Sequence, residues 1–211
     1  MRYDAEHKQK TRERVLKEAA KAIRSQGPHR IGVARVMGRA GLTHGGFYAH
    51  FASKEALVAA TIDQLFRESH RLARETQDRS PAEGLNAYID FYLSPEHRDG
   101  RTSGCPLPFL SADVPRLPRV SRERFAAGVA KRVEELAGHL ERLGRKDPQA
   151  DASSMLAELL GALSLARAEP NAKRSDAIMA RSRAALKRRL GLEGATQPRN
   201  THSRGRRDVD T

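Results

Sequence analysis

The sequence of 211 residues contains one cysteine, no tryptophan and few aromatic residues. The single thiol, Cys105, excludes an intrachain disulfide and any metal site built from several cysteines, as is usual in a reducing compartment. No segment approaches the ~18 consecutive apolar residues of a membrane span. The charged N-terminus has no apolar stretch behind it. We therefore expect a cytoplasmic protein without a signal peptide or a membrane helix.

The common motifs of catalysis are also missing. The sequence has no Gly-x-Gly-x-x-Gly segment, no phosphate-binding loop, no Gly-x-Ser-x-Gly elbow and no paired metal-ligand histidines. The segment His44-Gly45-Gly46 resembles the oxyanion loop of an esterase, but without the elbow it has no nucleophile to serve. We expect no enzyme activity, no cofactor and no metal site.

Positive charge is abundant and unevenly placed along the chain. Thirty-nine Lys and Arg stand against 26 Asp and Glu, which gives a formal net charge of +13. The net charge is +8 over residues 1–54, −2 over residues 55–171 and +7 over residues 172–211. A basic end beside a near-neutral middle is typical of a nucleic-acid-binding head on an ordinary body, although a solvated basic surface gives the same count.

Helical periodicity runs through most of the chain, and no alternating strand pattern interrupts it. We predict an all-α fold with an N-terminal head over residues 1–54, a helical body over residues 55–192 and a basic disordered tail over residues 193–211. The polar segment 94–103 is expected to be a loop. Helices are predicted at about 8–26, 33–40, 55–79, 81–93, 105–110, 119–143, 151–168 and 175–190.

The segment from Gly41 to Lys54 breaks the local rules of helix formation. Gly41 suits the left-handed residue that ends a helix, and Thr43 suits the cap of the next one. The turn that follows nevertheless contains Gly45 and Gly46, each costing about 1 kcal/mol relative to alanine in a helix interior. Bare backbone at a helix N-terminus permits close approach and favours phosphate. The pattern predicts a helix-turn-helix whose second helix enters a major groove, with core anchors Phe47 and Phe51.

The residues from Val36 to Phe51, followed by the segment Ser53 to Leu57, resemble the DNA-binding signature of the TetR family of bacterial repressors. The resemblance covers about residues 10–57. It implies a three-helix DNA-binding head and a helical body for ligand binding and dimerisation. It also implies a homodimer on a near-palindromic operator, repressing until a small molecule in the body moves the heads apart. A helical protein that binds nucleic acid without any ligand is the alternative.

The resemblance assigns roles to single residues. His44, Gly46 and Ala49 face base edges. The DNA backbone is contacted by Tyr48, His50 and Lys54, and Thr43 caps the helix. Only His44 can read a base by hydrogen bonding, so shape readout is expected to carry much of the specificity. The family often has Thr or Ser where this chain has Gly32 and Val33, which leaves a backbone contact there. The predicted DNA contacts are Thr43, His44, Gly45, Gly46, Tyr48, Ala49, His50 and Lys54.

The basic outer face of the first helix has two interpretations, a solvated surface or a phosphate-contacting one. In the body, an aromatic pocket between helices is the usual place for an effector, although aromatic stripes also build cores. The candidates for the first helix are Lys8, Lys10, Arg12 and Lys17. The candidates for the effector site are Phe66, His70, Tyr88, Tyr92, Cys105, Phe109 and Phe125.

Cys105 occupies an expected N-cap with Pro106 at the first helical position. A helix N-terminus, with Arg98 and Arg101 nearby, would stabilise its thiolate, which makes it either a sensor of electrophiles and oxidants or a small buried residue. The last two helices carry apolar stripes that either pair with a second copy in a four-helix bundle or form internal core. These stripes consist of Met155, Leu156, Leu159, Leu160, Leu163, Ile178, Met179 and Leu186.

Overall fold

The computed structural model describes residues 2–74, 79–100 and 105–193, with side chains for residues 6–69, 79–100 and 105–193. Every regular element in these ranges is helical, as predicted for an all-α fold. The elements are α1 (Arg2–Gln26), α2 (Val33–Arg39), η1 (His44–Ala49), α3 (Lys54–Arg74), α4 (Pro81–Tyr92), α5 (Pro95–Asp99), α6 (Leu107–Leu110), η2 (Val114–Arg116), α7 (Arg119–Arg142), α8 (Pro148–Ala168) and α9 (Ala172–Arg189). The predictions for His70, Arg101 and the tail from residue 194 concern side chains or segments outside these ranges.

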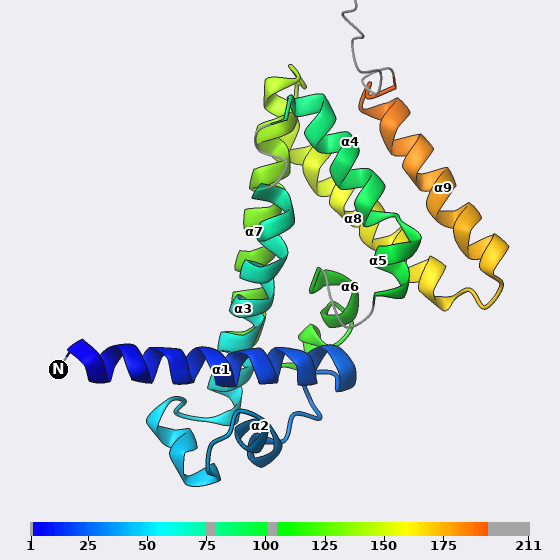
Figure 1. Cartoon of the computed structure of the whole chain (residues 1–211). Helices are drawn as coiled ribbons and strands as arrows, with labels where there is room; N and C mark the ends of the chain where they lie inside the picture. Colours follow the sequence, from blue (N-terminus) through cyan, green and yellow to red (C-terminus); the bar gives the residue numbers. More distant parts are fainter. Residues whose placement is uncertain (1, 75–78, 101–104, 194–211) are drawn as a thin grey trace, which may run out of the picture.

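The helices form a small head below a taller body (Figure 1). In the head, α1 packs on α2 and η1 packs on α2, while α3 packs on α1 and carries the chain into the body. There α3 lies along α7, α7 packs on α8, and α8 packs on α9. Within the described ranges, no helix combines the length and apolarity needed to cross a bilayer.

The turn between α2 and η1 forms as its sequence predicts. Gly41 adopts the left-handed conformation with φ 68°, which a side chain would strain. The amide of Leu42 donates to the Met37 carbonyl at 3.0 Å, and the Gly41 amide donates to the Gly38 carbonyl at 3.0 Å. This pair of hydrogen bonds is the Schellman motif, which satisfies the last carbonyls of a helix. It fixes the direction in which the chain enters η1.

Apolar side chains anchor η1 to the rest of the head. Phe47 and Phe51 are 2% and 3% exposed, and their rings stack with centroids 5.8 Å apart. Both belong to a buried cluster that continues through α3 into the body. Burial of two phenylalanines supplies several kcal/mol, which outweighs the intrinsic cost of Gly45 and Gly46. The core anchors were therefore predicted correctly.

The prediction of a loop over residues 94–103 is wrong for its first half, where α5 forms. The Ser94 hydroxyl accepts from the His97 amide, and Pro95 occupies the first helical position. At the other end, the Arg167 guanidinium of α8 donates to the carbonyls of His97 and Arg98 at 2.7 and 3.0 Å. Five residues do not make a stable helix alone. Contacts from a distant helix thus stabilise α5, and no local pattern shows them.

Several helix limits also differ from the prediction. Helix α1 begins at Arg2 rather than near residue 8, because the polar residues that precede its apolar stripe continue the helix into solvent. Helix α3 begins at Lys54 rather than at residue 55 and is described as far as Arg74, and residues 75–78 of the expected helix lie outside the described ranges. Helix α6 begins at Leu107, so the expected helix 105–110 is shorter by two residues at its start.

The apolar stripes expected at a dimer interface lie inside the chain itself. Side chains from both helices are less than 5% exposed in the monomer: Met155, Leu156, Leu159, Leu163, Met179 and Leu186. Leu160 and Ile178 are partly buried and pack against this core. Helix α8 lies between α7 and α9, so its apolar side chains contact both neighbours. For these residues the internal-core interpretation is correct.

Candidate nucleic-acid interface and effector site

The polar and glycine residues of η1 face solvent. Thr43, His44, Gly45 and Ala49 are exposed, and Gly46 is half-buried above Met37. Nothing lies within 4 Å of the position that a Cβ on Gly45 would occupy. The outer surface of η1 is therefore smooth and open, and another molecule can approach its backbone closely.

The helix itself differs from the expected one. The segment His44–Ala49 is a 3-10 helix, and Thr43 at its N-cap makes no side-chain capping hydrogen bond. The Gly46 amide instead donates to the Thr43 carbonyl at 3.2 Å. Two consecutive glycines disfavour a regular α-turn, and the anchoring of Phe47 and Phe51 sets the path of the chain. The capping role predicted for the Thr43 hydroxyl is therefore wrong, and that hydroxyl remains exposed.

Tyr48 is the most exposed large hydrophobic residue in the described part of the head, with 70% of its surface accessible. Its ring stands edge-on to the buried Phe47 ring, with centroids 5.2 Å apart at 77°. This contact supports the aromatic body while the hydroxyl is presented outward. An exposed tyrosine held in this way suits a hydrogen bond to a phosphate oxygen.

Cations of α1 flank the C-terminal end of η1. The Arg12 guanidinium lies over the Phe51 ring, 4.8 Å from its centroid. Burial lowers the pKa of His50, and the charges of Lys8 and Arg12 lower it further. The Nδ1 atom of His50 is buried without a partner, so the neutral tautomer with its proton on Nε2 is favoured. Lys8 and Arg12 therefore share one surface with η1, whereas Lys10 pairs with Glu6 at 2.8 Å.

Lys54 follows η1 and links the head to the body. Its Nζ donates to the His29 carbonyl at 3.2 Å, which holds the ammonium near the loop between α1 and α2. The imidazole of His29 lies 4.0 Å from the Asp113 carboxylate, next to η2. Sequence reasoning placed Lys54 at the interface but did not find this contact, because the partners are far apart in the sequence.

Three of the effector candidates meet in the body. The Tyr88 and Tyr92 rings lie 5.7 Å apart, and the Tyr92 hydroxyl lies 4.0 Å from the Cys105 sulfur. The Arg132 guanidinium of α7 lies over the Tyr88 ring at 5.8 Å and donates to Glu135 and Ser69. Burial raises the pKa of both tyrosines, so their hydroxyls stay neutral. Arg132 was not predicted, because a lone arginine in a polar helix gives no signal.

The other aromatic candidates form a second cluster. Phe66 of α3 meets Phe125 of α7 edge-on, with centroids 5.6 Å apart. Gly128 lies directly against the Phe66 ring, so the two helices approach closely there. Phe109 is partly buried and packs against the core. These contacts are those of a packed core, and the side chain of His70 lies outside the described part of the structure.

Cys105 does not occupy the N-cap that the sequence suggested. Pro106 is the N-cap of α6, and Cys105 precedes it. Burial raises the pKa of the Cys105 thiol, which outweighs the lowering by the Leu107 amide and by Arg132. Arg98 pairs instead with Asp99 and Asp176, at 2.8 and 2.6 Å. The prediction of a stabilised thiolate is therefore wrong.

The raised pKa predicts slow reaction of Cys105 with iodoacetamide at neutral pH. Only the thiolate reacts, so the rate should still rise about tenfold per pH unit through the range in which a free thiol has levelled off. Rates measured against pH by mass spectrometry test this, with the protein unfolded in urea as the control. A folded-state midpoint near or below pH ~7 would contradict burial as the dominant effect and favour a reactive sensor.

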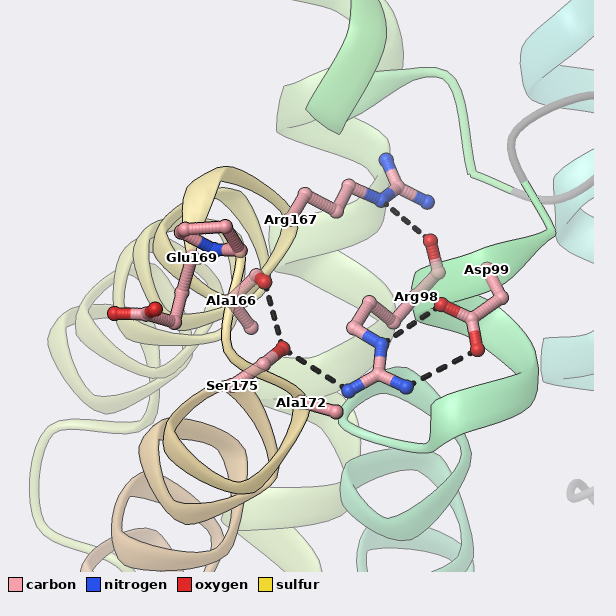
Figure 2. Close-up of a pocket in the computed structure, with 8 residues that line it drawn as sticks. Arg98, Asp99, Ala166, Arg167, Glu169, Ala172 and Ser175 are labelled. Carbon is pink, nitrogen blue, oxygen red and sulfur yellow. Dashed lines mark hydrogen bonds and ion pairs between the residues drawn. The ribbon is translucent and has the colours of Figure 1, made fainter.

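One pocket of about 210 Å³ lies away from these aromatic residues, where α5 meets the ends of α8 and α9 (Figure 2). It is open and mainly polar, lined by Arg98, Asp99, Ala166, Arg167, Glu169, Pro170, Ala172 and Ser175. No local sequence pattern indicates this pocket, because its walls come from three separate segments.

Comparison with known proteins agrees with the geometry of the head. Residues 15–61 match the model of the bacterial regulatory proteins of the tetR family. Over 85 residues the chain is 32% identical to the HTH-type transcriptional regulator TtgR of Pseudomonas putida. That match covers 40% of this chain and spans only 40% of the length of the relative.

Solved structures extend the likeness to the body. The reduced form of NemR from E. coli superposes with a TM-score of 0.74 at 25% identity, covering 85% of this chain and 96% of the other. A TetR-family transcriptional regulator from Agrobacterium tumefaciens gives a TM-score of 0.70 at 26% identity, covering 86% and 98%. The matched head and the shared helical body together identify a regulator rather than an enzyme. Residues 15–61 are thus a DNA-binding head of the tetR family of bacterial regulatory proteins, and the described chain shares the overall fold of TetR-family regulators.

Proposed function

We propose that the chain is a DNA-binding transcriptional repressor that acts as a homodimer and releases a near-palindromic operator when an effector binds. In this proposal, residues 1–54 form the DNA-binding head and residues 55–192 the effector and dimerisation body. Each head places η1 in a major groove, and the two grooves lie about one helical turn apart. The effector is a small molecule or an electrophile.

The observation that carries the proposal is that the open η1 lies within a long stretch of the sequence that contains no acidic residue. The sequence contains no Asp or Glu between Glu18 and Glu55, whereas it contains six Lys or Arg there. Lys8 and Arg12 add positive charge beside His50. A stretch with this excess of positive charge attracts phosphates, so binding should depend steeply on salt.

The side chains that face outward divide into two roles. His44 can hydrogen-bond a base edge, and Ala49 can touch a thymine methyl group. Tyr48, His50, Lys54 and the cations of α1 suit phosphate contacts, which position the head without reading sequence. With only one side chain able to hydrogen-bond a base, the shape of the operator contributes to specificity.

The proposed dimer surface is the outer face of α8. The exposed side chains of this face are uncharged, and the carboxylates of Asp151 and Glu158 on the same helix pair with Arg145 at 2.7 Å and with Arg189 at 2.9 Å. Leu165 is 63% exposed on it, which is unusual for a large apolar side chain. Small residues permit close approach of a second α8 from another copy of the chain. The exposed residues of this face are Ser153, Ser154, Ala157, Ser164 and Leu165.

The proposed effector site lies around Tyr88, Tyr92 and Cys105, with the second cluster of Phe66 and Phe125 beside it on α3 and α7. Aromatic faces and a few buried polar groups are the usual composition of a small-molecule site between helices. The Arg132 guanidinium over Tyr88 supplies a positive charge for an anionic or carbonyl group. His70 and Phe109 complete the set of candidate contacts.

Two substitutions in the head distinguish base readout from phosphate contact. His44→Ala should alter which sequence is preferred, with a loss of about 1–3 kcal/mol at one base position. Lys54→Ala should weaken all sequences alike and reduce the salt dependence by about one phosphate contact. Competition binding against operator variants, performed at several salt concentrations, measures both effects.

The control for this experiment is Lys173→Ala, which removes an exposed cation from α9, far from the head. It should leave both sequence preference and salt dependence unchanged. Equal effects of His44→Ala and Lys54→Ala on every sequence would contradict the assigned roles. Binding that shows no sequence preference at all would favour the ligand-independent nucleic-acid-binding alternative.

A further inference from the structure

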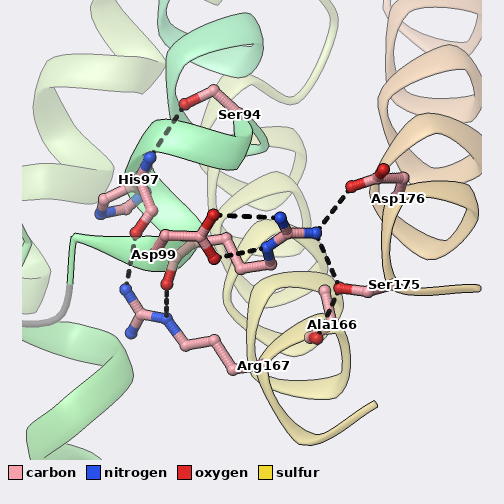
Figure 3. Close-up of polar contacts among 8 residues, drawn as sticks. Ser94, His97, Asp99, Ala166, Arg167, Ser175 and Asp176 are labelled. Atoms are coloured by element: carbon pink, nitrogen blue, oxygen red, sulfur yellow. Dashed lines mark hydrogen bonds and ion pairs between the residues drawn. The ribbon is translucent and has the colours of Figure 1, made fainter. Parts of the chain in front are cut away.

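The Arg98 side chain joins α5 to the start of α9. Its Nη1 donates to the Asp176 carboxylate at 2.6 Å and to the Ser175 hydroxyl at 3.0 Å (Figure 3). Its Nε and Nη2 hold the carboxylate of Asp99 at 2.8 and 3.1 Å. The Arg98 side chain is only 15% exposed, whereas the side chains of Asp99 and Asp176 are 67% and 58% exposed, so solvent screens these ion pairs and the forked geometry rather than their strength defines the connection.

Two further contacts close this connection into a ring through α8. The buried Ser175 hydroxyl, which accepts from Arg98, donates to the Ala166 carbonyl of α8 at 2.7 Å (Figure 2). The next residue of α8, Arg167, donates back to the carbonyls of His97 and Arg98. Hydrogen bonds thus join α5 to α9, α9 to α8, and α8 back to α5. We call these contacts of Arg98, Asp99, Arg167, Ser175 and Asp176 the arginine ring.

The other side of α5 contacts the candidate effector site. The His97 ring, 3% exposed, lies edge-on to Tyr92 at 4.8 Å and stacks on Phe91 at 5.1 Å. Its Nδ1 donates to the Tyr92 carbonyl at 2.8 Å, while its Nε2 is buried without a partner. Tyr92 in turn reaches the Cys105 sulfur. One short helix therefore separates Cys105 and Tyr92 from the arginine ring.

We propose that the arginine ring couples the outer face of α8 to the Tyr92–Cys105 site, so that dimerisation and occupation of that site influence each other through α5. This inference rests on the proposed dimer surface. Packed elements with several directional bonds shift as units rather than deform continuously. A second copy seated on α8 fixes Ala166 and Arg167, and the ring then fixes α5 and Tyr92. The coupling is reciprocal, because two sites that share a free energy affect each other equally.

Cys105 reports on this coupling directly, because it is the only thiol in the chain. The full-length protein is labelled with 5,5′-dithiobis(2-nitrobenzoate) at fixed pH, and the rate constant is measured across a dilution series. Analytical ultracentrifugation over the same series gives the monomer and dimer fractions. We expect labelling of the monomer to be at least about fivefold faster than labelling of the dimer, as for a typical coupling between sites.

Arg98→Gln should remove this difference and give the monomer rate at every concentration. Arg174→Gln is the matched control, because Arg174 lies one residue before Ser175 and pairs with Glu169 at 3.1 Å, but has no bond to α5. It should retain the full difference. Arg98→Lys keeps a positive charge for one ion pair but lacks the forked guanidinium, so it should restore part of the difference in labelling rate between monomer and dimer. Asp176→Asn provides a milder variant if Arg98→Gln fails to fold.

The outcomes separate this proposal from the one on which it rests. A chain that stays monomeric at all concentrations would overturn the dimer surface and the coupling together. A dimer whose Cys105 labels at the same rate as the monomer would overturn the coupling alone. An unchanged concentration dependence in folded Arg98→Gln, or in Asp176→Asn if Arg98→Gln does not fold, would likewise show that the arginine ring does not carry it.

Discussion

Gly45→Glu is expected to weaken operator binding by about 100-fold or more while leaving the head folded. A side chain at Gly45 meets nothing within 4 Å, so the substitution has room in the free protein. In the proposed complex the same side chain enters the space between η1 and the DNA and brings a negative charge towards phosphates. Loss of close contact and charge repulsion together exceed the ~1–3 kcal/mol of a single base contact. Fluorescence anisotropy with labelled operator measures the loss.

The control for Gly45→Glu changes net charge by the same amount at a distance from the head. Lys146→Gln alters an exposed residue of the loop between α7 and α8, outside the proposed dimer surface. It should change affinity only slightly, through the long-range field. Circular dichroism and thermal unfolding should show both variants folded. Undiminished binding by folded Gly45→Glu would mean that η1 does not face the DNA.

Gly128→Ala is expected to destabilise the body by about 2–3 kcal/mol, although alanine is the better helix former. A Cβ at this position would lie 2.4–2.5 Å from three carbons of the Phe66 ring, closer than any real contact. Phe66 is 4% exposed and held edge-on by Phe125, so the ring has no space into which to turn. Helices α3 and α7 must therefore move apart. Urea unfolding at a fixed protein concentration measures the loss.

Gly138→Ala provides a matched control in the same helix. Nothing lies within 4 Å of a Cβ at Gly138, so only the intrinsic preference for alanine acts there. We expect this variant to be as stable as the parent or more stable by up to about 1 kcal/mol. The two substitutions should thus have opposite signs. Equal destabilisation by both would indicate a general intolerance of α7 rather than the contact with Phe66.

Local chemistry was sufficient to predict the head. Gly41 favours the left-handed turn at the end of α2 independently of the rest of the chain. Phe47 and Phe51 are the buried aromatic residues that anchor η1. The roles of the candidate DNA contacts came from the resemblance to the TetR family and not from local chemistry, and they remain predictions. The detail that failed, the Thr43 cap, depends on whether two glycines form an α-turn or a 3-10 turn, which differ little in free energy.

The body shows where prediction from one sequence stops. Helix α5 is stabilised by Arg167, which lies almost seventy residues later in the chain. Ser94 and Pro95 suit the start of a helix, but Pro95 and Gly100 are also common helix breakers, and the prediction of a loop followed from them. The stripes on α8 and α9 have the correct helical period, but periodicity cannot tell which partner an apolar face meets. The pKa of Cys105 depends on the surrounding burial and not on its sequence neighbours alone.

Methylation protection of guanine N7 on DNA fragments selected by the purified protein tests the central proposal most directly, because N7 lies in the major groove. We predict two protected patches on one face of the duplex, with centres about 34–36 Å or one helical turn apart, that vanish with Gly45→Glu. A single patch, or tight binding that leaves every guanine N7 reactive, would contradict the placement of η1 in successive major grooves.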